Sequence, residues 1–518
     1  MNFRTGVNTA MSHFLGIDLG TSSVKVLLVT DAGEVLSQGS AEYPLDRPRP
    51  DRAEQGPEHW WQATSAAVRQ TLANIAEKSI SIAAIGLSGQ MHGTVLLDRA
   101  GHLLAPAVIW PDQRSRQQVR EITDLIGAER LIELTGSPVA TGFQAATLRW
   151  VQQEQPDLWQ QVAMIMLPKD YLRWRMTGEF QTDPSDGSGT LLLDVHHRDW
   201  STELLTALDL DRAKLPPVQP STAVVGQLQR RAAATLGLPP GIPIVTGAAD
   251  TAASLLGASI IADQTLLVTI STGGQLILPA MDVRVDPAGR LHTFCAAVTP
   301  AVDQPGWYLM AAILSAGLAL RWLRDQVLGR PGKLSYPEMM TWAENVPAGS
   351  NGLLFLPYLL GERTPHMDPQ ARGLFLGLSA NHGQAEFVRS VLEGVALACY
   401  DAYQVLAELG VRPERIVMAG GGARSRLWQQ IVADIFGLPV RRLDVSDQSA
   451  LGAALLAGAG VGQFDPVQAA QDWARYGPPL DPDQQQLAIY QDMLSLFRDA
   501  YQKHRTNFHR LQALAGKH

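Results

Sequence analysis

The sequence contains very little cysteine. Two cysteines occur in 518 residues, Cys295 and Cys399, and both lie in apolar surroundings far apart in the chain. This pattern excludes a disulfide framework and indicates buried thiols in a reducing compartment. The first residues also lack a basic segment followed by an apolar core, and no apolar run reaches the roughly 18 residues needed to span a bilayer. We therefore expect a cytoplasmic protein with no membrane partner.

Charge of one sign is also scarce. The formal net charge is -8, charged residues make up 18% of the chain, and they form no long block of either sign. A nucleic-acid-binding surface needs a basic patch, so nucleic acid is excluded as an expected partner. The expected partner is a small molecule.

The chain is too long for a single hydrophobic core. Cores stop growing at about 250–300 residues, so a chain of 518 residues predicts two domains. We place the first at residues 14–258 and the second at 259–479. Residues 1–13 lack periodicity and are expected to form an N-terminal extension, and residues 480–518 a helical tail.

Each predicted domain opens with a strand, a short polar turn and a returning strand. These strands are predicted at Phe14–Leu19 and Val24–Thr30 in the first domain, and at Thr265–Ile270 with a return to Leu278 in the second. Strands and helices then alternate, which predicts an α/β fold class with two domains of related design. Three of the expected helices are Ala312–Leu328, Gln384–Leu409 and the Ala-rich Gln448–Ala459, all within the second domain.

The first turn has the composition of an anion-binding loop. Asp18 lies near the end of the first strand, and Gly20, Thr21 and Ser22 form the turn. Glycine allows a backbone angle that other residues avoid, and successive N–H groups in such a turn form a concave site for phosphate. Asp18, beside that site, is a candidate ligand for hydrated magnesium. An ordinary hairpin that uses one glycine is the alternative.

A second turn of similar composition follows the strand that ends at Ile270. It consists of Ser271, Thr272 and Gly273, followed by another glycine. The recurrence of a hydroxyl-rich glycine turn in each half of the chain favours phosphate binding at both.

One carboxylate, Asp250, lies between a strand and an Ala-rich helix, with no basic residue nearby in the sequence. It could cap the helix N-terminus. It could also accept a proton from a substrate hydroxyl, which is the role of a carboxylate in phosphoryl transfer to alcohols. The two phosphate-type turns favour the second interpretation.

Two further segments are candidates for ligand contact. Gly421, Gly422 and Ala423 follow an apolar strand and open a helix, where the backbone can approach a ligand closely; a tight strand-to-helix connection is the alternative. Met91 and His92 lie in a loop after another strand, and His92 is either a hydrogen-bond partner for a polyol or an ordinary loop histidine. The chain has no P-loop pattern, so a bound nucleotide would use another architecture.

Taken in order, these motifs resemble the FGGY family of sugar kinases, with similarity from Phe14 to about Gly460. The segments that carry the resemblance are GIDLGTSSVKV, LSGQMHG, WPDQR, LPKDYLRWRMTGE, SDGSGT, GAADTAAS, FLPYLLGERTPHMDPQARGLFLGL, VLEGVA and GGGARSRLWQQIVADIFGLPV. The resemblance implies two ribonuclease-H-like domains, as in the actin and sugar-kinase ATPases, facing a central cleft. Among family members, the segments are most similar to those that act on D-xylulose.

The resemblance also implies a reaction and a role for each candidate residue. The reaction is ATP-dependent phosphorylation of D-xylulose at its terminal hydroxyl, with ATP and magnesium as cofactors; a homodimer is left open. Asp250 would be the general base, and Met91, His92 and Thr251 would contact the sugar. The remaining assignments are Gly20, Thr21 and Ser22 near the transferred phosphate, Asp18 near magnesium, Ser271, Thr272 and Gly273 along the phosphates, and Gly421, Gly422 and Ala423 under the adenosine.

Two departures from the family pattern keep alternatives open. Thr251 stands where many of the most similar members have Asn, and the second turn reads Ser-Thr-Gly where Gly-Thr-Ser is usual. A kinase for another ketose or polyol is therefore the second interpretation. A sugar-binding protein that has lost catalysis is an alternative from a different class.

Overall fold

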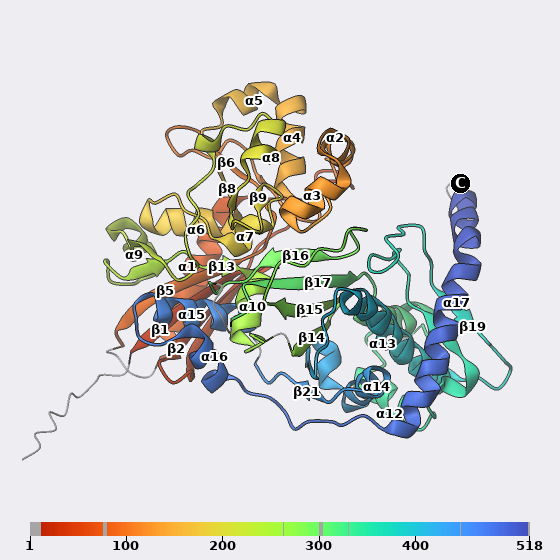
Figure 1. Ribbon diagram of the computed structural model, residues 1–518. Helices are drawn as coiled ribbons and strands as arrows, with labels where there is room; N and C mark the ends of the chain where they lie inside the picture. The colour runs from red at the N-terminus through yellow and green to blue at the C-terminus, as the bar shows by residue number, and fades with distance from the viewer. Residues whose placement is uncertain are drawn as a thin grey trace, which may run out of the picture. The chain divides into compact units, whose positions relative to one another are not determined.

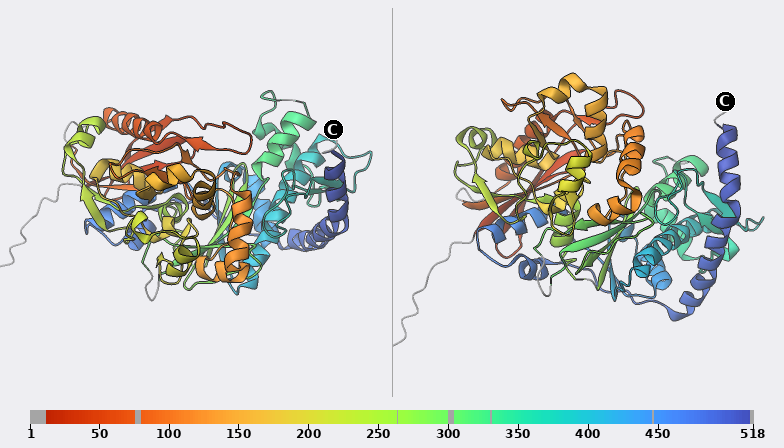
Figure 2. Two further views of the ribbon diagram at one scale, coloured as in Figure 1. Left: turned by 90° about the horizontal axis from the view of Figure 1, so that it is seen from above. Right: turned by 45° about the horizontal axis from the view of Figure 1, so that its top comes forward.

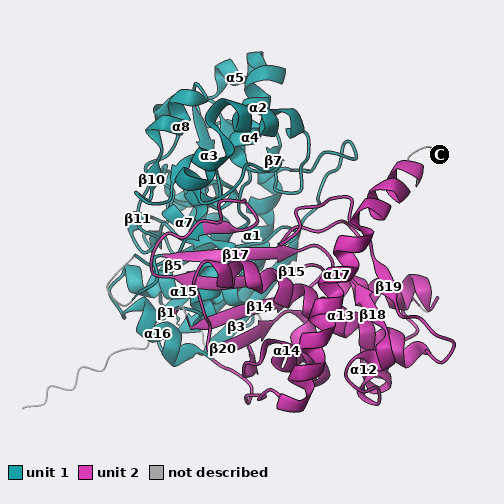
Figure 3. Ribbon diagram, turned by 45° about the vertical axis from the view of Figure 1, so that its right-hand side comes forward, with its two compact units in different colours: residues 1–261, 294–306, 445–474 teal, residues 262–293, 307–444, 475–518 magenta. Residues whose placement is uncertain are grey.

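The computed structural model describes residues 12–75, 80–262, 264–299, 304–329, 331–445 and 447–515. The chain forms two compact α/β units, shown in different colours in Figure 3. Unit 1 comprises residues 1–261, 294–306 and 445–474, and unit 2 comprises 262–293, 307–444 and 475–518. The expected N-terminal extension lies, up to residue 11, outside the described residues.

Unit 1 is built on a seven-stranded sheet in the order β11-β12-β5-β1-β2-β3, with β13 also pairing with β5. The strands β1 and β2 are antiparallel, and β1 is parallel to β5. The predicted opening strands are thus confirmed. Their bounds are β1 (His13–Leu19), β2 (Ser23–Thr30), β3 (Val35–Glu42), β5 (Ile82–Gly89), β11 (Val224–Gln227), β12 (Pro243–Val245) and β13 (Ala248–Ala249).

Helices cover both faces of this sheet (Figures 1 and 2). Helix α1 (Pro57–Ala73) packs on β2 and β3, where a Cβ at Gly39 would come within 2.3 Å of a carbonyl oxygen of the helix. Helix α15 (Gln448–Gly460) packs on β1 and β5. There, Gly16 and its strand partner Gly86 each leave so little room that a Cβ would lie 1.9 Å from a carbonyl oxygen of α15. Glycine at these two strand positions is therefore required by the close approach of α15.

The position of α15 changes the division of the chain. The sequence assigned residues 259–479 to one domain, whereas 445–474 pack within unit 1. Helix α15 also crosses α10 (Asp250–Gly257), where a Cβ at Gly452 would meet the Ala253 carbonyl at 1.9 Å. An Ala-rich helix follows the unit 2 strands in sequence, but its small residues fit the glycines of the unit 1 sheet.

Unit 2 contains a six-stranded sheet in the order β16-β17-β15-β14-β20-β21. The second predicted hairpin is confirmed, since β14 (Thr265–Ile270) pairs antiparallel with β15 (Gly274–Ala280). The predicted long helix is present as α13 (Gln384–Glu408), most of whose side chains are buried. The helix expected from Ala312 is wrong in its start, because β17 (Trp307–Ile313) continues through that residue and α11 begins at Gly317.

The remaining elements connect and cover the two sheets. In unit 1 they are β4 (Glu54–Gln55), β6 (Val95–Leu97), β7 (Ala107–Val108), α2 (Arg116–Ile126), α3 (Ala128–Thr135), α4 (Gln144–Glu154), α5 (Pro156–Gln161), β8 (Met164–Met166), α6 (Pro168–Thr177), α7 (Pro184–Ser188), β9 (Leu193–Asp194), β10 (Asp199–Trp200), α8 (Thr202–Ala207), α9 (Arg230–Leu236) and α16 (Pro466–Trp473). In unit 2 they are α11 (Gly317–Trp322), α12 (Tyr336–Glu344), β18 (Leu354–Leu356), β19 (Leu374–Leu376), α14 (Arg426–Phe436) and α17 (Gln484–Ala515). The six-stranded sheet itself also includes β16 (His292–Cys295), β20 (Arg415–Ala419) and β21 (Val440–Arg442).

The cysteines and the apolar helices bear on two expectations about the whole chain. Cys295 and Cys399 are both free and buried, as expected. Within the described part of the chain, we find no helix that is both long and apolar enough to cross a membrane.

Candidate active site

The turn between β1 and β2 is held by backbone and side-chain contacts. The Gly20 N–H donates to the Ser23 carbonyl at 3.1 Å, and the Thr21 hydroxyl accepts from the Trp110 indole N–H at 3.0 Å. Ser22 is exposed. The expectation that Gly20 needs a special backbone angle is wrong, because its φ is not positive. Its Cβ would instead lie 3.3 Å from the Ser23 carbonyl, so the tightness of the turn favours glycine.

Asp18 lies beside this turn and has a perturbed carboxyl group. Burial raises its pKa to about 6, although the hydrogen bond from Ser88 and the charge of Lys25 act in the opposite direction. Ser88 Oγ donates to Asp18 Oδ1 at 2.8 Å. In the described part of the chain no hydrogen bond reaches Oδ2, which leaves this oxygen for a ligand.

Lys25 of β2 forms an ion pair with Asp447. Its Nζ lies 2.5 Å from Asp447 Oδ1, and its side chain is 44% exposed. This ion pair joins β2 to the residue that precedes α15.

Asp250 is the first residue of α10, and Ala249 is the N-cap. Asp250 Oδ1 accepts the Thr251 N–H at 2.6 Å and the Thr251 hydroxyl at 3.2 Å. Burial and the nearby negative charge of Asp18 raise the Asp250 pKa to about 7, against the lowering effect of the Thr251 bonds. Among the described residues, no hydrogen bond reaches Asp250 Oδ2. A carboxylate with one oxygen held and a pKa near neutrality suits proton acceptance.

Met91 and His92 lie in the loop after β5, which is parallel to β1. Met91 is buried, and the His92 backbone has a φ of 72° that is uncommon for a residue other than glycine. His92 Nδ1 lies 2.6 Å from the Gly189 carbonyl, so Nδ1 carries a proton and donates it. The imidazole packs on Phe143, with ring centroids 3.9 Å apart. These contacts hold the His92 ring in one orientation.

Unit 2 carries the other candidate residues. Ser271 and Thr272 are exposed, and their carbonyls accept N–H groups from the segment before and at the start of α11, including Gly317 at 2.7 Å. Gly273 is close to β17, because a Cβ there would lie 2.8 Å from the Ile313 carbonyl.

The glycine turn after β20 lies beside the Ser271 turn. Gly420 has a φ of 79°, and a Cβ there would lie 2.7 Å from Ser271 Oγ. Among the described residues, no atom beyond its two chain neighbours would lie within 4 Å of a Cβ at Gly421, whereas Gly422 packs on Ile270 and the Ala423 side chain is buried. The structure therefore brings together the two turns that the sequence assigned to phosphates and adenosine.

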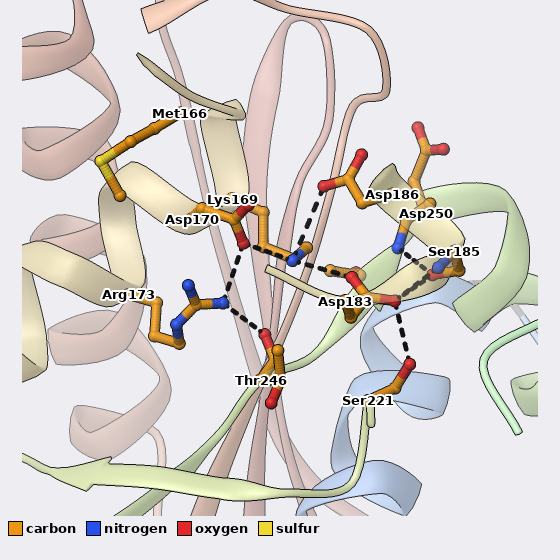
Figure 4. A network of polar contacts seen from close by, with 12 residues as sticks. Met166, Lys169, Asp170, Arg173, Asp183, Ser185, Asp186, Ser221, Thr246 and Asp250 are labelled. Carbon is orange, nitrogen blue, oxygen red and sulfur yellow. Dashed lines mark hydrogen bonds and ion pairs between the residues drawn. The ribbon is translucent and has the colours of Figure 1, made fainter. Parts of the chain in front are cut away.

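A buried polar network near Asp250 was missed by the sequence reasoning (Figure 4). Its charged members are Lys169, Asp170, Arg173, Asp183 and Asp186, each with a side chain that is 0% exposed. Ordinary surface segments contain such residues, so composition gave no signal. The signal available was that Lys169, Asp170, Arg173 and Asp186 lie in two of the segments that carry the family resemblance, with Asp183 two residues before the second of these segments.

A bound magnesium ion would be consistent with the Asp18 side chain. No group of three or more His, Cys, Asp or Glu side chains that could hold a metal occurs among the described residues. Magnesium is commonly bound by one or two carboxylates, with water and substrate phosphates completing its shell. Asp18 Oδ2 meets that requirement for one protein ligand.

Two family models match this chain in succession. The N-terminal domain of the FGGY family of carbohydrate kinases matches residues 13–257, and the C-terminal domain matches 281–461. This chain belongs to the FGGY family of carbohydrate kinases. It is therefore a phosphotransferase that acts on a carbohydrate.

Relatives of this FGGY kinase match it along nearly its whole length. The xylulose kinase of Escherichia coli (strain K12) is 36% identical over 498 residues, which cover 95% of this chain and 99% of the relative. A solved structure of a "xyloylose kinase" from Brucella ovis has a TM-score of 0.88 and 33% identity, covering 95% of this chain and 99% of that one. A gluconate kinase structure from Lactobacillus acidophilus has a TM-score of 0.90 at 26% identity, covering 97% and 100%.

Proposed function

We propose that this FGGY kinase transfers the terminal phosphoryl group of ATP to the terminal hydroxyl of D-xylulose. Relatives named for xylulose that match the chain end to end support this acceptor. The observation that carries the chemistry is Asp250, whose pKa is raised to about 7 and whose Oδ2 receives no hydrogen bond from the described residues. Phosphoryl transfer needs little covalent chemistry from the protein, so positioning and charge stabilisation account for most of the catalysis.

In this proposal each candidate residue has one task. Asp250 Oδ2 accepts the proton of the attacking hydroxyl, while Thr251 holds Oδ1. Met91 and His92 border the sugar. Asp18 holds magnesium, which when bound neutralises charge on the phosphates.

The phosphates and the nucleotide are assigned to backbone-rich turns. Gly20, Thr21 and Ser22 contact the transferred group, Ser271, Thr272 and Gly273 follow the phosphates, and Gly421, Gly422 and Ala423 lie under the adenosine. The adjacency of Gly420 to Ser271 supports a continuous nucleotide site within unit 2.

An ADP-coupled assay over a panel of acceptors tests the substrate. We expect the highest kcat/KM with D-xylulose, against D-ribulose, L-ribulose, L-xylulose, glycerol and gluconate. Absence of turnover with D-xylulose contradicts the proposal. Preference for another ketose or for glycerol would favour the second interpretation, a kinase for another ketose or polyol. Gluconate is included because a gluconate kinase has a similar fold.

Replacement of Asp250 tests the mechanism. Asp250→Ala is expected to lower kcat by about 10³-fold or more, since proton acceptance is lost, while ATP still binds. Sugar binding without ADP formation by the unsubstituted protein would instead identify a catalytically silent sugar-binding protein. The open question of a homodimer is tested by size-exclusion chromatography with light scattering.

A further inference from the structure

The short helix α7 contacts two candidate active-site segments. Ser185 Oγ accepts the N–H of Ala249, the residue before Asp250, at 3.0 Å. At the other end, the carbonyl of Gly189, which directly follows α7, accepts from His92 Nδ1 at 2.6 Å. The residues of α7 thus lie between the proposed base and a proposed sugar contact.

Ser185 is itself held by a buried carboxylate, that of Asp183. Its hydroxyl donates to Asp183 Oδ2 at 2.5 Å, and the Ser185 N–H donates to the same oxygen at 2.9 Å. Because the hydroxyl proton is committed to Asp183, the oxygen lone pairs are left to accept from Ala249. A hydroxyl group at this position is needed for both bonds.

Asp183 is held in turn by the buried cation Lys169. The Lys169 Nζ lies 2.6 Å from Asp170 Oδ1, 3.1 Å from Asp183 Oδ1 and 3.6 Å from Asp186 Oδ2, and all four side chains are 0% exposed. Breaking a buried ion pair of this kind is costly because it leaves an uncompensated charge. The network therefore gives Asp183, and hence Ser185, little freedom to move.

The backbone leading to Asp250 is held at both ends by this network (Figure 4). Arg173 Nη1 donates to the Thr246 carbonyl at 2.8 Å, and Ser185 holds the Ala249 N–H. Between them, Gly247 has a φ of 82° and presses so closely on β5 that a Cβ would lie 2.1 Å from the Leu87 carbonyl. Asp250 is the next residue after the second anchor.

We propose that Ser185 is a positioning residue for the Asp250 carboxylate. By holding Ala249 against the Asp183–Lys169 pair, it fixes the first turn of α10 and the direction of Oδ2. This inference rests on the proposed role of Asp250 as the base. Displacement of a reacting group by about 1 Å can cost about 10²-fold in rate, so the loss of one such bond is expected to affect kcat.

Two serines that donate to the same oxygen provide a matched test. Ser221 Oγ also donates to Asp183 Oδ2, at 2.9 Å, but within the described part of the chain its side chain makes no hydrogen bond to residues 246–250. Ser185→Ala and Ser221→Ala therefore remove equivalent bonds to Asp183, and Ser185→Ala alone removes the bond to Ala249. Both variants of the full chain are compared by Tm and by steady-state kinetics with D-xylulose and ATP.

We expect Ser185→Ala to lower kcat by about 10–100-fold, with the KM for ATP changed less than about twofold. We expect Ser221→Ala to lower the Tm by about as much as Ser185→Ala does, and to keep kcat within about threefold of the value for the unsubstituted protein. The pH dependence of kcat/KM for the sugar should shift in Ser185→Ala and not in Ser221→Ala. Equal kcat losses in the two variants, or an unchanged kcat in Ser185→Ala, would overturn the inference.

Two additional variants keep the test decisive. If Ser185→Ala does not fold, Ser185→Cys retains the size of the side chain but has a poorly accepting sulfur, and we expect about a tenfold loss of kcat; an unchanged kcat contradicts the proposal. Asp250→Asn separates the two proposals. Full activity in Asp250→Asn would contradict the assignment of the base, whereas inactive Asp250→Asn together with equal serine variants would contradict only the role of Ser185.

Discussion

Asp250 shows how its surroundings give one carboxyl group a useful pKa. Burial and the charge of Asp18 disfavour its ionised form, and the bonds from Thr251 favour it. Burial and the charge of Asp18 prevail, so the pKa is raised from 3.8 to about 7. The group is therefore half ionised near neutral pH, where it can both accept and release a proton.

The pH dependence of the reaction follows from that value. We expect kcat/KM for D-xylulose to fall about tenfold per pH unit below a pH of about 7, because a protonated base cannot accept the hydroxyl proton. Above that pH the rate should reach a plateau. Initial rates between pH 5.5 and 8.5 with saturating ATP provide the measurement, and a flat profile across this range would be inconsistent with Asp250 as the base.

The same shift predicts a pH-dependent effect on stability. The carboxyl titrates near 3.8 when unfolded and near 7 when folded, so its ionisation destabilises the folded state progressively as pH rises through this interval. Asp250→Asn removes this ionisable group and therefore the destabilisation that its ionisation causes. We expect its Tm to exceed that of the unsubstituted protein by roughly 3 °C or more at pH 8, and by much less at pH 5. Differential scanning calorimetry at the two pH values would show whether this difference grows.

At the scale of residues, the sequence predicted the groups that have a local signal. Asp18 and Asp250 stand out as carboxylates beside glycine turns or helix starts. The contact of Ser88 with Asp18, and that of Ser185 with Ala249 beside Asp250, could not be predicted, because each serine lies far away in the sequence from the residue it contacts. The angle proposed for Gly20 was wrong because tight turns also select glycine for space.

At the scale of elements, α17 is attached to unit 2 by a buried polar cluster. Glu393 of α13 accepts from Tyr490 Oη of α17 at 2.9 Å and from Arg389 Nε at 2.7 Å. Arg389 also donates to the Tyr490 oxygen. Glu393 also accepts from the Gly349 N–H and the Ser350 hydroxyl, and the buried Phe497 and Tyr501 of α17 belong to the hydrophobic core of unit 2.

Removing one hydroxyl tests this attachment. Tyr490→Phe is expected to lower the free energy of unfolding by about 1–3 kcal/mol, because it leaves bonds of Glu393 and Arg389 unmade in a buried site. Tyr400→Phe serves as a control, since its ring packs on Phe436 and its hydroxyl has no hydrogen bond within the described residues. Urea denaturation of both variants gives the two values. An equal effect would show that the cluster adds nothing specific.

Local periodicity predicted the strands with which each half of the sequence begins. The strands Phe14–Leu19 and Thr265–Ile270 were confirmed because alternating apolar residues and flanking turns determine them locally. The start of the helix expected at Ala312 was wrong because the segment is equally apolar on both sides of the boundary. Pairing of β17 with β15, a tertiary contact, decides that this residue is in a strand.

At the scale of the whole molecule, unit 1 is assembled from separate parts of the chain. Its sheet comes from the residues before 261, and α15 arrives from 445–474. The sequence predicted two α/β domains, but it did not predict that residues 445–474 return to the first of them. Nothing in the local pattern of an apolar, Ala-rich helix specifies which sheet it covers.

A fragment experiment tests the dependence of unit 1 on α15. Residues 1–261 alone are expected to aggregate or to bind a hydrophobic dye, because Gly16 and Gly86 lie on a strand surface that α15 covers. Joining residues 445–474 through a flexible linker should restore a cooperative thermal transition. A cooperative transition in the shorter fragment would show that α15 contributes little to folding.

The late position of α15 in the chain also has a consequence for synthesis. A ribosome completes the strands of unit 1 roughly 200 residues before it makes the helix that covers them. At about 5–20 residues per second, that interval lasts about 10–40 s. Throughout this time the nascent chain exposes the glycine-rich surface of β1 and β5, so unit 1 completes its folding only after most of unit 2 has been translated.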